Sequence, residues 1–265
     1  MPPAMTPLAY TIAAALAGGV LAVVAAAFTL ALRASWVQRL VSFAVGALLG
    51  AVFLELLPHA LEQGSAERVM LTVLVGLLAF FLLEKLVLWR HSHGHDEHRD
   101  DIDESEHDHA LHAYDQGRSG LMILIGTAVH NFCDGVVIAA AFLADVSLGV
   151  AATVAIVAHA VPQQVGDFAV LLHSGYRRAR AFAYNVAAGL ATLVGALAGH
   201  FALAGMQQIL PTVLAIAASS LLYVAVADLI PSLHRRSEPL ETAKQALLIG
   251  LGVAIIAVVH ASHAH

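Results

Sequence analysis

The sequence predicts an all-α integral membrane protein: an eight-transmembrane-helix bundle with an inverted 3+2+3 repeat. Of its 265 residues, 59% are hydrophobic and only 12% are charged, whereas soluble domains carry about 25% charged residues. The apolar residues form eight runs, each long enough for a helix that crosses the hydrocarbon core. The basic residues also fall almost entirely on one side of these runs. We therefore expect a single membrane domain over residues 1–265.

The eight spans follow one another with short connections, except for one long loop at 91–118. The first apolar run, Leu8 to Leu32, lacks a basic leader and is too long for a signal peptide, so we expect a retained span. Ala, Leu, Val and Gly dominate the spans, which suits close helix packing in lipid. The expected spans are 6–32, 37–61, 67–90, 119–144, 147–174, 179–205, 209–232 and 241–261.

Orientation follows from the basic residues. Of the 13 Lys and Arg residues, all but Arg68 lie at odd-numbered connections, which the positive-inside rule places in the cytoplasm. Both termini are then expected outside. We expect a multi-pass protein of the plasma membrane, a bacterial inner membrane in particular.

The inverted repeat is predicted from a short echo. Span two ends in ELLP at residues 55–58, and span seven ends in DLIP at residues 228–231. These spans are the middle members of the first and last triplets and cross in opposite directions, as an inverted repeat requires. A four-residue match also arises by chance, and that alternative stays open here.

Spans four and five carry the chemistry. Span four contains HNFCDG at residues 130–135, in which His130 and Asp134 share a helix face. Span five contains HAVPQQVGD at 159–167, in which His159 and Gln163 share a face with Asp167. Both histidines lie near mid-membrane, where ionisable side chains are costly and usually functional.

A metal site explains these residues better than separate helix–helix hydrogen bonds do. Imidazole and carboxylate together suit Zn, Fe, Mn and similar ions, whose charge offsets the cost of burying Asp134. Pro162 should free the Ala158 carbonyl and kink span five beside His159, which is tolerated only where protein or water satisfies the freed group.

These motifs resemble the fourth- and fifth-span signatures of the ZIP metal transporters, especially the branch with HNFxDG and HExPHExGDFAxLL. The similarity continues at residues 184–185 and 222–228 and covers nearly the whole chain. It implies an eight-helix bundle, outward termini, metal movement into the cytoplasm through spans two, four, five and seven, and a homodimer.

The chain departs from that pattern in span five, where Ala160, Gln163 and Gln164 replace coordinating or titratable side chains. A two-metal centre is not expected, because Ala160 cannot bridge two ions. A single site built from the two histidines and Asp134 survives, with Gln163 as an oxygen donor and Gln164 as a weak neutral one. Asn131 completes part of a second site in this interpretation.

Two further places in the spans hold candidate ligands. Glu55 and His59, four residues apart near the outer end of span two, form an entrance ligand pair or, equally, are interfacial polar residues. Asp228, near the inner end of span seven, receives the exiting cation or serves as a cap. The histidines of the C-terminal tail, His260 among them, are interpreted as a weaker signal and as surface residues.

The third connection is the most polar stretch of the chain. Residues 91–115 hold seven histidines and nine acidic residues with almost no apolar ones, so we expect disorder. Such mixtures bind metals weakly and exchange them quickly. We expect a cytoplasmic metal-capturing loop rather than merely a solvated one.

The resulting hypothesis is a divalent cation transporter, not an enzyme, that takes Zn²⁺ or alternatively Fe²⁺, Mn²⁺ or Cd²⁺ into the cytoplasm. It requires no cofactor, and its partners are metal ions, membrane lipid and a second copy, with no nucleic acid. Cys133 is the only cysteine, and no phosphate loop is present, so we expect no intrachain disulfide, no CxxC site and no ATP-driven pumping. The alternatives are a transport-inactive metal sensor or partner protein of this fold, and an intramembrane metalloenzyme, which usually needs HExxH.

Overall fold

The computed structural model describes residues 6–21, 23–24, 27, 34–92, 107–234 and 238–263. These residues form helices and short connections, and no strand occurs among them. Seven helices in this part of the chain are long and apolar enough to cross a membrane, and Pro7–Val20 is a shorter apolar helix. The protein is therefore an all-α, multi-pass membrane bundle, as the sequence predicts.

The first half of the bundle contains the first three predicted spans. Helix α1 (Pro7–Leu16) begins at an N-cap, Thr6, and continues as a π-helical segment, Ala17–Leu21. Helix α3 (Ala34–Gly50) runs through the π-helical segment Ala51–Leu56 into α4 (Leu57–Gln63). Helix α5 (Ala66–Ser92) follows after a two-residue connection.

The second half contains the two central spans and the last triplet. Helix α6 (His107–Ala144) and α7 (Val146–His173) are separated by one residue, and α8 (Arg178–Leu203) follows. After a 3-10 turn at Gln207–Ile209, α9 (Leu210–Tyr223) continues through a π-helical segment, Val224–Leu229, into α10 (Ile230–Leu233). Helix α11 (Pro239–His263) ends the described chain.

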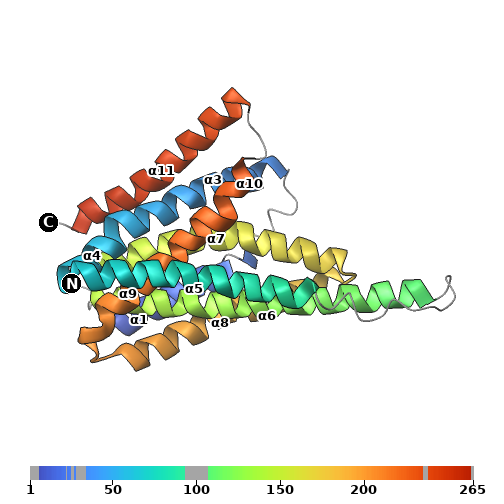
Figure 1. The fold of residues 1–265 in the computed structure, drawn as a ribbon, viewed down its shortest axis with the longest axis horizontal. Coiled ribbons are helices and arrows are strands. Elements are labelled where there is room, and N and C mark those ends of the chain that lie inside the picture. Colours follow the sequence, from blue (N-terminus) through green and yellow to red (C-terminus); the bar gives the residue numbers. More distant parts are fainter. Residues whose placement is uncertain are drawn as a thin grey trace.

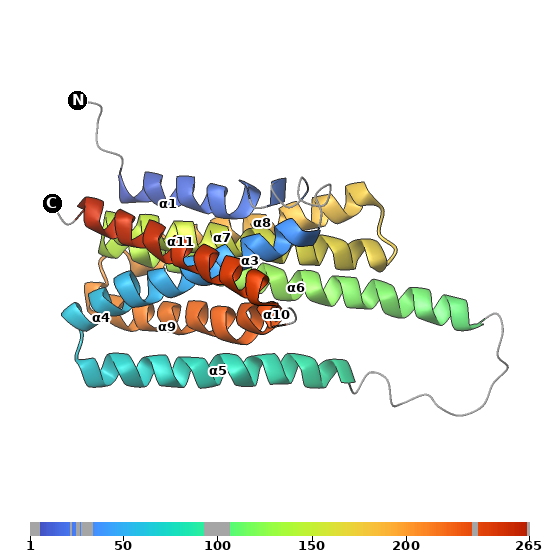
Figure 2. The same ribbon diagram turned by 90° about the horizontal axis from the view of Figure 1, so that it is seen from above.

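Figures 1 and 2 show the helices running roughly along one direction, with the start of α1 and the end of α11 at the same end of the bundle. The opposite end carries the connection from α7 to α8, where Arg177, Arg178 and Arg180 lie. We call these the terminal end and the basic end. Helix α6 extends beyond the rest of the bundle at the basic end (Figure 2).

That extension departs from the predicted disorder of the third connection. Residues 91–92 complete α5, and residues 107–118 form the start of α6. A helix that already exists is lengthened easily, because only its nucleation is costly. Residues 93–106, with their histidines and acids, lie outside the described residues.

The two halves share a local distortion in the same register. The π-helical segments Ala51–Leu56 and Val224–Leu229 each place the acidic residue of the ELLP or DLIP motif fifth, and each precedes a helix that starts just before the proline. In both, the N–H group that follows the segment bonds five residues back, Leu57 to Val52 and Ile230 to Ala225. Helix α3 packs on α11 as α9 packs on α5. These correspondences support the inverted repeat and argue against a chance match.

Helix α6 lies unusually close to α8. A Cβ atom on Gly135 would clash with the Thr192 carbonyl, and one on Gly195 would clash with the Phe132 carbonyl. Small residues at such crossings let two backbones approach in lipid. This contact fixes the rotation of α6 beside Asp134 and therefore decides which way the motif of span four faces.

Candidate metal centre

The turn between α6 and α7 sets the depth of the central motifs. The two helices are joined at Asp145 alone, whose side chain caps α7 by accepting hydrogen bonds from the Ser147 and Leu148 N–H groups. Burial raises the pKa of Asp145, but the hydrogen bonds from Ser147 and Leu148, together with nearby His59, outweigh it, so the pKa lies below its ordinary value. His130 and His159 lie fifteen and fourteen residues from this turn. They are therefore at the same depth.

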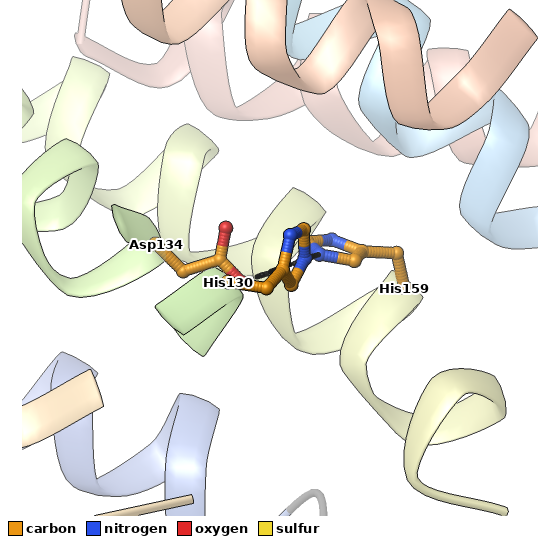
Figure 3. Close-up of side chains that lie close together, drawn as sticks. All are labelled: His130, Asp134 and His159. Carbon is orange, nitrogen blue, oxygen red and sulfur yellow. Dashed lines mark hydrogen bonds and ion pairs between the residues drawn. The ribbon is translucent and has the colours of Figure 1, made fainter. Parts of the chain in front are cut away.

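Three side chains of the motifs meet at that depth. The Nε2 atoms of His130 and His159 are 3.2 Å apart. The Oδ2 atom of Asp134 lies 3.4 Å from Nε2 of His130 and 3.3 Å from Nε2 of His159. Figure 3 shows the two rings and the carboxylate converging from α6 and α7. Within the described residues, this is the one group of three or more His, Cys, Asp or Glu side chains whose ligand atoms lie close enough to share an ion.

The triangle of ligand atoms has the dimensions of a zinc site. An ion at about 2.05 Å from all three atoms, a usual Zn–N or Zn–O distance, would subtend angles of about 103–112° between them at these separations. The tetrahedral angle of about 109° lies within that range. Such an ion would sit slightly outside the plane of the three atoms and keep a fourth position open for water or another donor.

Two of the three triad side chains are almost fully buried, and the ring of His159 is held by a backbone carbonyl. Asp134 is 2% exposed and His159 is 1% exposed, while the His130 side chain is 24% exposed. A carboxylate buried to this extent needs a cation or several hydrogen bonds. Nδ1 of His159 faces the Ala155 carbonyl at 3.1 Å, so with Nδ1 protonated its Nε2 lone pair points toward Asp134 and His130. The triad is thus one group in which a cation would offset the buried charge.

The remaining residues of the central motifs lie around the triad. The Asn131 side chain donates from Nδ2 to the Ala188 carbonyl at 2.9 Å, so that nitrogen bonds α8 rather than the triad. Gln164 is 1% exposed, and its Oε1 is buried without a hydrogen-bond partner in the described structure. Gln163 is partly exposed, one turn from His159. Helix α7 stays helical through Pro162.

At the terminal end, Glu55 has a partner other than the one that its spacing suggested. Its Oε1 lies 3.2 Å from Nδ1 of His260, on α11. His59 instead contacts Gln63, through atoms 2.8 Å apart. His260 was not predicted as a partner of Glu55; the signal for it was that the last helix ends at the level where span two ends.

Asp228 lies in the π-helical segment of span seven and is exposed. It is not part of the group formed by His130, Asp134 and His159. A second contact that sequence reasoning missed joins Thr127 and Asp167, whose side-chain oxygens are 2.8 Å apart. The position of Thr127 one turn before His130 was the available signal for this contact.

The chain is similar to a known family of membrane proteins over most of its length. The family profile described as ZIP zinc transporter matches residues 5–110 and 89–260. The chain is 30% identical over 237 residues to zinc transporter ZIP13 of Pongo abelii, which covers 83% of this chain and 65% of that protein. It is 30% identical over 269 residues to the ZIP13 homolog of Drosophila melanogaster, 83% of this chain and 76% of that protein. Human zinc transporter ZIP4 is 31% identical over 255 residues, 76% of this chain and 39% of that longer protein.

Proposed function

The chain belongs to the ZIP zinc transporter family, and from that premise we propose that it carries divalent cations, Zn²⁺ first among them, through the triad of His130, Asp134 and His159. The observation that carries this proposal is the triangle of ligand atoms with 3.2–3.4 Å sides. Two imidazoles and one carboxylate suit Zn²⁺, and with a less exact fit Fe²⁺, Mn²⁺ or Cd²⁺.

We place the basic end in the cytoplasm and the terminal end outside, in the plasma membrane of a bacterium. The support is the distribution of Lys and Arg between the ends of the spans. A cation would then meet Glu55 and His260 first, reach the triad, and leave past Asp228 toward the cytoplasm. Burial of Glu55, which is 6% exposed, supports its role as an entrance ligand with His59 nearby. We also propose that two copies pair in the membrane.

The triad also favours transport over permanent storage. Three protein ligands leave at least one position of a four-coordinate ion open, so the ion can exchange with water or with the next donor. Gln163 and Gln164 place amides where the family motif has an imidazole and a carboxylate, which are stronger ligands, and Ala160 replaces a second carboxylate. We therefore propose one primary ion in the centre.

A transport-inactive metal sensor or partner protein is the second candidate, and a specific observation supports it. Ala160 and Gln164 are 4% and 1% exposed, respectively, so the substituted positions lie inside the bundle beside His159 and not on a tolerant surface. A sensor would bind the ion at the triad without passing it on. An intramembrane metalloenzyme has less support, because Ala160 removes the general base of a HExxH motif.

Flux into proteoliposomes separates these functions. Purified protein is reconstituted with a metal-sensitive dye inside the vesicles, and Zn²⁺ or Cd²⁺ is added outside. We expect uptake above that of empty vesicles, and its loss on His130→Ala. Binding of Zn²⁺ to the purified protein without any uptake would identify a sensor instead.

A further inference from the structure

A second polar contact crosses the same pair of helices nearer the basic end. The Thr127 hydroxyl, on α6, donates to Oδ2 of Asp167, on α7, at 2.8 Å. Thr127 precedes His130 by one turn, and Asp167 follows His159 by two turns on the same face. The Thr127–Asp167 contact therefore lies roughly 5–12 Å from the triad, in the direction of the basic end.

The surroundings of Asp167 differ from those of Asp134. Asp134 contacts two imidazoles. Asp167 is half-buried. In the part of the chain that the structure describes, its side chain is hydrogen-bonded to the neutral Thr127 hydroxyl and has no charged side chain as a partner. A carboxyl group inside a membrane protein without a cationic partner is costly and marks an ion pathway by default. An asparagine would make the same hydrogen bond at lower cost, so the hydroxyl contact alone does not explain an aspartate.

The residue before each member of this contact is a glycine with open space around it. Gly126 precedes Thr127, and Gly166 precedes Asp167. Apart from its chain neighbours and the backbone of its own helix, no atom lies within 4 Å of the place where a side chain on either glycine would begin. Both glycines are exposed, and no neighbouring side chain covers them.

We propose that Asp167 and Thr127 form a second cation station, which takes the divalent ion from the triad and passes it toward the basic end. This inference rests on the proposed transport function. The station offers one carboxylate and one hydroxyl, with water supplying the remaining ligands, whereas the triad offers two imidazoles and a carboxylate. Borderline-soft ions such as Zn²⁺ prefer the nitrogen-rich set, and conduction requires that later sites bind weakly enough to release the ion. Gln163 lies between the two on the same face of α7, one turn from each.

The test compares flux with binding in the same variants. Asp167→Asn keeps the size and the hydrogen bond but removes the charge. We expect its Zn²⁺ or Cd²⁺ flux in proteoliposomes to fall by about tenfold or more, within the range of losses on removal of a supporting metal-site residue. Zn²⁺ affinity at the triad, measured by calorimetry on the purified protein, should change by less than about threefold, because the two sites do not share ligands. His130→Ala should lose both flux and affinity.

Matched controls exist for both side chains. Asp145→Asn removes a carboxylate from the other end of α7, where asparagine is an equally good helix cap, and should leave flux unchanged. Thr127→Val should lower flux by a smaller factor than Asp167→Asn. Thr11→Val removes an equally buried hydroxyl on α1, one bonded only to the Pro7 carbonyl among the described residues, and should have no effect on flux.

The outcomes are distinct. If the unmodified protein shows no flux, the transport function and this station fail together. If it transports, and His130→Ala is inactive while Asp167→Asn transports normally, the station alone is wrong. If Asp167→Asn loses affinity as much as flux, Asp167 belongs to the primary site and the relay is refuted.

A second measurement covers the case in which Asp167→Asn does not fold. Asp167→Glu keeps the charge and should retain most of the flux. Asp167→Cys, in a Cys133→Ala background, should react with a charged thiol reagent added from the basic end, and Cd²⁺ should protect it. A cysteine at this position that does not react, in folded protein, would overturn the proposal.

Discussion

Asp134→Asn tests the centre most directly. The substitution keeps the side-chain volume in a site that is 2% exposed and removes only the negative charge that two imidazoles face at 3.3 and 3.4 Å. Removing one partner from a buried charge pair costs about 3–5 kcal/mol. At about 1.4 kcal/mol per tenfold change in the dissociation constant, Zn²⁺ affinity should fall by about two to three and a half orders of magnitude.

The expected loss of Zn²⁺ affinity follows from the ligands that remain in the variant. Without the carboxylate, the ion meets two neutral nitrogens 3.2 Å apart and an amide, and the site no longer balances the charge of the dication. Calorimetry with Zn²⁺ on the purified variant measures the affinity, and proteoliposome uptake should be lost with it. Thermal unfolding in detergent, without metal, checks that the fold survives.

Cys133→Ala is the matched control. Cys133 is adjacent in sequence but exposed, so its removal should leave affinity and uptake unchanged. Removal of a residue that only supports a metal ligand already costs about tenfold or more in affinity. An Asp134→Asn variant whose Zn²⁺ affinity stays within about threefold of the unmodified protein would therefore refute the assignment of the triad. Equal losses in both variants would point to a packing defect of α6.

The remaining predictions concern span five, the polar connection and the cap of α7. Restoring the family motif with Ala160→Glu, Gln163→His and Gln164→Glu should tighten Zn²⁺ binding by about tenfold or more and slow the release of the ion. Calorimetry measures the affinity, and single-turnover efflux measures the release rate. Weaker binding would mean that the new side chains do not reach the ion. Deleting residues 93–106 should preserve uptake but change its dependence on metal concentration, and a folded deletion variant without flux would place the loop in the pathway. Asp145→Ala removes the cap of α7 and should cost about 1 kcal/mol of stability. The folded-state pKa of Asp145 lies below its ordinary value near 3.8. The stability that the cap contributes is therefore present above pH 3.8 and is lost as the pH falls through the folded-state pKa. A difference in thermal unfolding between variant and parent that does not shrink in acid would contradict this prediction.

The sequence alone determined the class of the protein and predicted the level of its metal centre within the spans. Long apolar runs and one-sided basic residues are consequences of the hydrocarbon core and the membrane potential, and both can be identified without coordinates. His130 and His159 could be placed at one level because each lies near the middle of its predicted span. The spacing of His130 and Asp134 also placed both on one face of α6. The ligand types then predicted a divalent cation.

Only the tertiary structure decided which groups meet at that depth. Helical spacing tells which residues share a face, but the direction of the face depends on packing against every neighbour, such as the close crossing of Gly135 with Thr192. That crossing turns Asp134 toward both imidazoles, while the Asn131 amide bonds α8. The pairing of Glu55 with His260 joins residues 205 positions apart, and the contact of Thr127 with Asp167 joins two helices. No local pattern encodes such contacts, because they depend on how the helices are rotated and shifted against one another in the folded bundle.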